Sequence, residues 1–226
     1  MNNTLHVNGK EASTMGATPL NNDFTDILEG RRSVRNYDPN VKISKEEMLD
    51  MLNEAAKAPS SVNMQPWRFL IVQSDEGKET LKPLIRFNRK QNKTSSAMIV
   101  VFGDMQCYER AGQIYNGAAD KGLMPKLMAK AQLAAVVPTY KKASREKMND
   151  IVKIDSSLFA MQFMLVARSH GYDTNPIGGF EEDRVADAFG IDSQRYVPAL
   201  IIAVGKASAP GHQSVRLPVD DLIWWR

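Results

Sequence analysis

Three short apolar runs constrain the fold of this chain more than any other feature. They are RFLIVQS at 68–74, AMIVVFGD at 97–104 and ALIIAVG at 199–205. Each run is rich in Val and Ile and is bounded by turn residues, which is typical of a buried β-strand. Segments with helical spacing lie between the runs. This alternation of helix and strand predicts an α/β or an α+β fold.

The expected helices are recognised mainly by their ends. A short helix is predicted at about 23–29, and a longer one begins after Ser44, which forms a capping box with Glu47. In SSLFAMQFMLVARSHG at 156–171, apolar residues leave almost no polar face, so we expect this helix to be buried all round. A shorter helix, EDRVADAFG, is expected at 182–190.

The chain is expected to form one domain with an arm and an irregular helical part. Residues 1–20 are polar, and we expect them to be loosely ordered or draped on a partner. Residues 21–226 would then form a single domain, in keeping with the length of 226 residues. Several Gly and Pro residues interrupt the helical pattern at 105–150, which predicts a mobile lid or an excursion from the core.

Charge and cysteine content exclude several classes of protein. The net charge is +3, from 29 basic and 26 acidic residues, which is too small to indicate a nucleic-acid-binding protein. Cys107 is the single cysteine, so neither an internal disulfide nor a cysteine zinc cluster can form. The N-terminus lacks the pattern of a secretory signal, and no apolar run approaches the roughly 20 residues of a membrane span. We therefore expect a cytoplasmic protein.

Residues 31–35, RRSVR, gather three arginines at one point of a nearly neutral chain. If the segment is extended, Arg31, Ser33 and Arg35 face one way, and Arg32 and Val34 face the other. Guanidinium groups match the geometry of a phosphate, and the serine hydroxyl adds a further hydrogen bond. The segment is therefore a candidate cradle for a phosphate monoester.

Each candidate binding stretch also has a plain structural interpretation. The arginines of 31–35 also fit a solvated loop, or ion pairs with Glu29 and Asp38. The loop APSSVNMQPW at 58–67 holds amides and hydroxyls that can bond a polar ring, yet it also fits an ordinary turn. In NPIGGF at 175–180 the Gly pair lets a ligand approach the backbone closely, but it also fits a flexible turn. Arg216 in VRLP stands alone near the C-terminus.

These four stretches, in this order, resemble the nitroreductase family of FMN-dependent oxidoreductases. The family segments R-[RH]-S-[VI]-R and A-P-S-[SA]-x-N-x-Q-P-W match 31–35 and 58–67. A later P-[IV]-[GE]-G matches 176–179, and a terminal R-x-P matches 216–218. An intermediate N-x-x-Q matches Asn88 and Gln91. The resemblance covers roughly residues 22–226, and the ordered set of motifs is specific to the family.

The resemblance implies an α+β, nitroreductase-like fold. Its central sheet would be mostly antiparallel and flanked by helices on both sides. It also implies an intertwined homodimer, with C-terminal tails exchanged between subunits and two sites at the interface. The tail VDDLIWWR, with Trp224 and Trp225, suits such a docking segment, although packing within one subunit explains it equally well.

The resemblance further implies bound FMN as cofactor and NAD(P)H as reductant. Arg31, Ser33, Arg216 and Arg32 would hold the phosphate end. Arg35, Asn88 and Gln91 would lie at the pyrimidine edge of the ring, and the N–H of Gly178 or Gly179 would face flavin N5. The full set of implied cofactor-binding residues is Arg31, Arg32, Ser33, Arg35, Pro59, Ser60, Ser61, Asn63, Asn88, Gln91, Pro176, Ile177, Gly178, Gly179, Ser214 and Arg216. Of these, Pro59, Ser60, Ser61 and Asn63 would come from the other subunit.

The implied reaction is hydride transfer from NAD(P)H through flavin N5 to an electron-poor acceptor such as a nitroaromatic or a quinone, in ping-pong turnover. The flavin does the chemistry, so we expect no catalytic side chain and no metal. Many family members carry a lysine where this chain has Ser214, and some carry a lysine where it has Gln91 and a glutamate where it has Gly178. A flavin-binding carrier or sensor with little turnover shares the same motifs and stays an alternative. A hydrolase that uses Cys107 and a histidine as a nucleophile pair is a second alternative, and the sequence favours it less.

Overall fold

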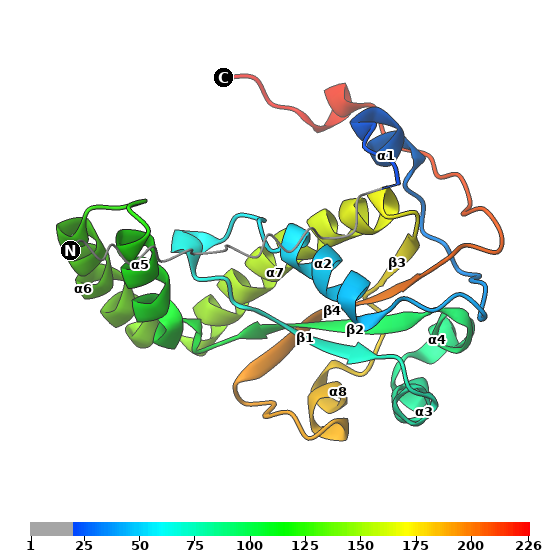
Figure 1. Ribbon diagram of the computed structural model, residues 1–226, viewed down its shortest axis with the longest axis horizontal. Helices are drawn as coiled ribbons and strands as arrows, with labels where there is room; N and C mark the ends of the chain where they lie inside the picture. Colours follow the sequence, from blue (N-terminus) through cyan, green and yellow to red (C-terminus); the bar gives the residue numbers. More distant parts are fainter. Residues whose placement is uncertain (1–19) are drawn as a thin grey trace, which may run out of the picture.

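A four-stranded antiparallel sheet in the order β1-β2-β4-β3 forms the centre of the protein (Figure 1). The structure is a computed structural model, and it describes residues 20–226. The strands are β1 (Trp67–Val72), β2 (Ala97–Asp104), β3 (Asp173–Ile177) and β4 (Tyr196–Gly205). The α-helices are α1 (Phe24–Gly30), α2 (Lys45–Ala55), α3 (Asp75–Leu81), α4 (Arg89–Thr94), α5 (Ala111–Asp120), α6 (Lys126–Lys142), α7 (Arg145–Ser169) and α8 (Glu182–Ala188). Short 3-10 helices include η1 (Ser61–Asn63), η2 (Lys82–Leu84), η3 (Arg86–Asn88) and η4 (Cys107–Arg110).

Helices cover both faces of the sheet, because the inner strand β2 is apolar on both sides. Every residue of β2 is buried. Side chains alternate between the faces of a strand, so Ile99 and Val101 pack with α2 and α7, whereas Val100 and Phe102 pack with α8 and the residues around η2. The three predicted strands and the mostly antiparallel α+β architecture are confirmed.

The predicted helix ends are confirmed where local chemistry sets them. Helix α2 begins where the Ser44 hydroxyl accepts the backbone N–H of Glu47 at 3.1 Å. Helix α7 ends before Gly171, which has φ of +81°, a backbone angle at which a side chain is unfavourable.

Helix α7 differs from the prediction in its burial. Phe159 and Phe163 are fully buried, and the Phe159 ring lies 4.5 Å from that of Phe69. However, Leu158 and Met161 on the opposite side of the helix are 45% and 39% exposed. The expectation of a helix buried all round is therefore wrong for this chain alone. A helix that packs on one face of a single sheet buries only one stripe of its surface.

Strand β3 was missed by the sequence analysis, which placed a turn in this region. It lies at the edge of the sheet and pairs along its length with β4, from Asp173 opposite Gly205 to Ile177 opposite Ile201. Pro176 lacks an N–H, so it is tolerated at an edge better than in a central strand. The pairing with β4, rather than a local apolar pattern, makes this segment a strand.

Between β2 and α7 the chain leaves the sheet to form α5 and α6, which lie beyond the end of the sheet in Figure 1. The two helices share a small core that includes Tyr115, Val136 and Tyr140. Movement of this part as a lid stays a prediction, as does the division into an arm and one domain. The predicted arm falls almost wholly outside the described residues. No helix within residues 20–226 combines the length and apolar character needed to cross a bilayer.

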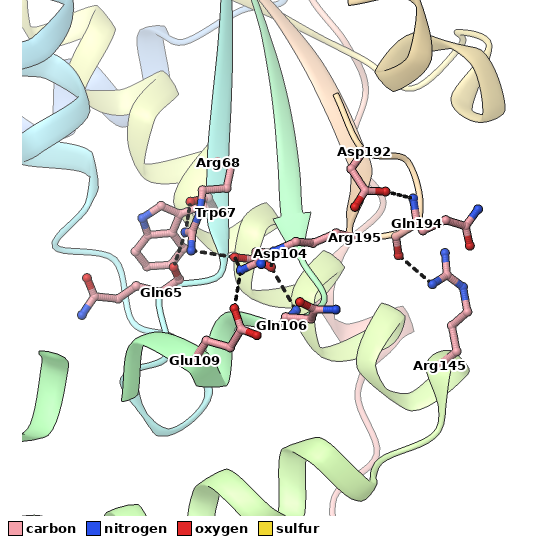
Figure 2. Close-up of polar contacts among 10 residues, drawn as sticks. All are labelled: Gln65, Trp67, Arg68, Asp104, Gln106, Glu109, Arg145, Asp192, Gln194 and Arg195. Carbon is pink, nitrogen blue, oxygen red and sulfur yellow. Dashed lines mark hydrogen bonds and ion pairs between the residues drawn. The ribbon is translucent and has the colours of Figure 1, made fainter. Parts of the chain in front are cut away.

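A buried carboxylate fastens this excursion to the sheet (Figure 2). Asp104, at the end of β2, is fully buried and lies 2.8 Å from Arg68 of β1 and 2.9 Å from Arg195 beside β4. Arg195 also pairs with Glu109 of η4 at 3.0 Å, and the backbone N–H of Gln106 donates to Asp104. Hydrogen bonding to Asp104 raises the pKa of Arg195, which favours its charged form.

Candidate functional site

A cleft of about 420 Å³ opens between the N-terminal arginine segment and the C-terminal tail. Within the described chain its walls hold four guanidinium groups, several neutral polar side chains and no carboxylate. The lining residues are Arg31, Arg32, Ser33, Arg35, His212, Gln213, Ser214 and Arg216. Six of these eight belong to the predicted cofactor-binding set.

The arginine segment is extended, as predicted, because it lies alongside β3. Ser33 forms a parallel bridge with Thr174, and the Val34 N–H donates to the Thr174 carbonyl at 3.0 Å. Val34 is buried in the core, whereas Ser33 and Arg35 are exposed on the cleft side. Burial of Val34 therefore fixes the direction in which its neighbours project.

Arg32 departs from the predicted alternation, because it lines the same cleft as Arg31 and Ser33. Arg31 is the C-cap of helix α1 and already has extended backbone angles, so Arg32 directly follows the end of the helix. The Arg32 guanidinium then folds back and donates to the carbonyls of Glu29 and Arg31. The prediction that Arg32 faces away is wrong for this reason.

The C-terminal segment returns beside the arginine segment and completes the cleft. The Ser208 N–H donates to the Asn36 carbonyl at 3.0 Å. Further along, Gly211 passes so close that a Cβ there would lie 2.5 Å from the Cβ of Arg32. Only glycine allows this approach, and the chain beyond it places Arg216 at the cleft.

No carboxylate among residues 20–226 neutralises the positive charge in the cleft. Burial lowers the pKa of Arg31, and the neighbouring charges of Arg216, Arg32 and Arg168 lower it further. Among residues 20–226, none of the four cleft arginines forms an ion pair with a carboxylate, so the predicted alternative of pairing with Glu29 or Asp38 is not seen. Arranged like this, the side chains can bind a doubly charged phosphate.

The two glycines Gly178 and Gly179 directly follow β3, the strand that bridges to the arginine segment. The bridge between Ser33 and Thr174 is parallel, so the arginine segment runs in the same direction as β3. Arg35 therefore lies toward the C-terminal end of β3, from which the chain continues to Gly178 and Gly179. Both glycines are exposed, and a Cβ on either would meet nothing within 4 Å. Their backbone is therefore open to a flat ligand. The two preceding residues also belong to the predicted cofactor-binding set. Pro176 is exposed, but the Ile177 side chain is buried in the core.

The Asn88 region joins the same end of the sheet. The Glu181 N–H, just after the Gly pair, donates to the Leu84 carbonyl at 2.8 Å, and Glu181 pairs with Arg86 at 3.0 Å. Two residues later, Asn88 accepts a hydrogen bond from the Gln91 amide at 3.0 Å. The two predicted amides thus contact each other and lie in the segment that borders the Gly pair.

The structure does not bring the remaining predicted residues to this cleft. Pro59, Ser60, Ser61 and Asn63 precede β1, at the opposite edge of the sheet from β3 and the arginine segment. Strands lie about 4.8 Å apart, so three spacings separate the two edges by about 14 Å. Sequence reasoning also missed His212 and Gln213, for which closeness to Arg216 in the chain was the only available signal.

Comparisons with known proteins agree with this geometry. The model of the nitroreductase family matches residues 28–206. A Bacillus subtilis protein named "Putative NAD(P)H nitroreductase YdgI" is 50% identical over 91% of this chain and 98% of its own length. The "CLA biosynthesis enone reductase" of Lactiplantibacillus plantarum is 37% identical, over 84% of this chain and 88% of that protein.

A solved structure from Exiguobacterium sibiricum, described as a "putative nitroreductase in complex with FMN", is 53% identical to this chain. It superimposes with a TM-score of 0.89, covering 93% of this chain and all of the other. The family match spans most of the sequence, and the fold and the motif residues fit it. This chain belongs to the nitroreductase family.

Proposed function

We propose that this protein is an NAD(P)H-dependent FMN oxidoreductase that reduces an electron-poor small molecule. The observation that supports it most is the cleft, where four arginines and a serine converge and no carboxylate from residues 20–226 lines the wall. A phosphate monoester offers close to two negative charges and three acceptor oxygens, which these donors complement. The residues present therefore fit the phosphate end of FMN, the molecule with which the Exiguobacterium sibiricum protein was solved in complex.

In this proposal the two ends of the site have different roles. Arg31, Arg32, Ser33, Ser214 and Arg216 hold the phosphate. Arg35, Asn88 and Gln91 bind the polar edge of the ring, and the backbone at 176–179 borders its reactive part. A fixed cation such as Arg35 stabilises the negative charge that reduction places on that edge.

The second half of each site is proposed to come from a partner subunit in a homodimer. The loop with Pro59, Ser60, Ser61 and Asn63 lies too far from the cleft of its own chain, so it would serve the cleft of the partner. The apolar side chains that are exposed in the part of the chain that the structure describes include Leu158, Met161, Trp224 and Trp225. Exposed apolar surface of this kind is typical of a protein interface.

When bound, FMN would supply the hydride chemistry, since its N5 takes a hydride from NAD(P)H and gives it to an acceptor such as a nitroaromatic or a quinone. The protein would contribute position and electrostatics. Gly178 and Gly179 leave the ring face open, so NAD(P)H and the acceptor would use one place in turn, in ping-pong order. The name of the Lactiplantibacillus plantarum relative adds enones to the acceptors worth testing.

The test is an absorbance spectrum of the purified protein, followed by anaerobic addition of NADPH or NADH. We expect a flavin spectrum that bleaches promptly and recovers when a quinone or a nitroaromatic is added. A bound flavin that does not bleach would instead support the carrier or sensor. A protein that fails to bind added FMN would refute the proposal.

A further inference from the structure

The loop from Ser60 to Gln65 has an unfavourable backbone. Val62, Asn63 and Gln65 have φ angles of 45°, 58° and 47°. A β-branched residue such as Val62 is rarely found at positive φ, and each such residue costs about 1–3 kcal/mol. A conformation of this kind persists only when its surroundings hold it in place.

Asp155, in the middle of α7, makes the strongest contact with this loop. Both of its carboxylate oxygens lie 3.0 Å from the backbone N of Ser61, and the Ser61 hydroxyl donates to Oδ1 at 3.0 Å. The side chain is only 1% exposed, and it forms no ion pair within residues 20–226. Burial raises its pKa above the ordinary value, and the hydrogen bonds from Ser61 offset only part of that rise. A buried carboxylate without a cation is unfavourable for folding, so stability alone does not explain this residue.

Other contacts hold the rest of the loop. The Tyr115 hydroxyl of α5 donates to the Val62 carbonyl at 2.8 Å, and the Tyr140 hydroxyl of α6 lies 3.5 Å from the Ser61 carbonyl. Figure 2 shows Arg68 reaching from β1 to the Asp104 carboxylate while it also donates to the Gln65 carbonyl at 3.1 Å. These partners bind backbone carbonyls. Asp155 alone among them binds an N–H and a hydroxyl of Ser61.

We infer that Asp155 is a positioning residue for cofactor binding. Its carboxylate fixes Ser61 and thereby keeps residues 59–63 in the one conformation that binds FMN in the site of the partner subunit. The inference rests on the proposed function, since it takes this loop as part of the FMN site. Without Asp155 the loop would relax to ordinary backbone angles and would have to be ordered again at each binding event.

The size of the effect follows from the population of the binding conformation. If the released loop adopts that conformation in about one molecule in ten, the apparent Kd for FMN rises about tenfold. Asp155→Ala removes all the contacts. Asp155→Asn keeps the volume and one acceptor oxygen, so it should lose less. Ser156→Ala is a matched control, because Ser156 is buried on the same helix but its hydroxyl faces the Phe102 carbonyl and not the loop.

The experiment has two readouts on the full-length protein. One is the Kd for FMN, with the visible circular dichroism of bound FMN. The other is amide hydrogen exchange at residues 61–63 in the FMN-free protein. We expect Asp155→Ala to raise the Kd at least about tenfold and to speed exchange, Asp155→Asn to raise the Kd less, and Ser156→Ala to match the wild type.

Wild-type Kd values in both Asp155 variants would overturn the inference, and so would unchanged exchange at 61–63 in Asp155→Ala. If Asp155→Ala does not fold, Asp155→Asn decides, because its side chain has nearly the same shape. A wild-type protein that binds no FMN refutes the proposed function instead. In that case the exchange readout still reports whether Asp155 holds the loop.

Discussion

Replacing Arg31 by alanine should have opposite effects on cofactor binding and on the stability of the cofactor-free protein. Arg31 lies half-buried among cations, and their repulsion and its burial lower its pKa. Alanine removes one guanidinium fork from the proposed phosphate site, so FMN should bind more weakly. It also removes repulsion between the cleft arginines, so the free protein should not become less stable.

The magnitude follows from the contacts that are lost. Hydrogen bonds to charged groups contribute about 1.5–3 kcal/mol. Since about 1.4 kcal/mol corresponds to a factor of ten, the Kd for FMN should rise about 10- to 150-fold. Arg31→Lys keeps the charge but not the planar fork, and its Kd should therefore fall between those of the wild type and Arg31→Ala.

The assay is a titration of FMN-free protein followed by flavin fluorescence, in a buffer without phosphate, because inorganic phosphate would compete for the cleft. Thermal unfolding of the same FMN-free samples gives the stability. Arg184→Ala serves as the control, because Arg184 is an exposed arginine of α8 that does not line the cleft. The reasoning is refuted if Arg31→Ala binds FMN as tightly as Arg184→Ala does.

Three further predictions concern the rest of the molecule. Asp104→Asn removes the buried charge that pairs with Arg68 and Arg195, and Arg195 keeps its pair with the exposed Glu109. Because both arginines are about a quarter exposed, the free energy of unfolding should fall by about 3 kcal/mol, or about 6–12 °C in Tm, while Lys82→Ala at an exposed pair should change Tm little. A drop no larger than that of Lys82→Ala would contradict this. Burial raises the pKa of Cys107 to about 12, so a thiol reagent at pH 8 should modify the native protein far more slowly than the unfolded chain; equal rates would show that the thiol is accessible. Deleting residues 219–226, with the exposed Trp224 and Trp225, should weaken the proposed homodimer, as measured by sedimentation, and an unchanged dimer would place the contact elsewhere.

Local chemistry explains what the sequence predicted correctly. Residues close in the chain determine the apolar strands, the N-cap at Ser44 and the helix end at Gly171. The sequence pattern of each is therefore enough to predict it. Strand β3 was not predicted, because Asn175 and Pro176 are poor strand formers and the segment becomes a strand only by pairing with β4. The exposed side of α7 was not predicted either, since an apolar residue such as Leu158 does not reveal which neighbour will cover it.

The candidate site shows the same division. Alternation in an extended segment placed Ser33 and Val34 correctly, because it needs only two neighbouring residues. It failed for Arg32, whose side chain turns back to the end of helix α1. The contribution of His212 and Gln213 depends on the return of the C-terminal segment along the arginine segment, and such a long-range contact leaves no local pattern.

The bridge between Ser33 and Thr174 also bears on how readily this protein would aggregate in solution. Strand β3 is an edge strand, and edge strands offer unpaired N–H and C=O groups to other chains. Here the arginine segment occupies that edge, with the Val34 N–H bonded to Thr174. The residues proposed to bind the phosphate therefore also shield a site of strand addition. Conditions that detach the segment would open a route to aggregation, and a ligand that keeps it in place would slow that route.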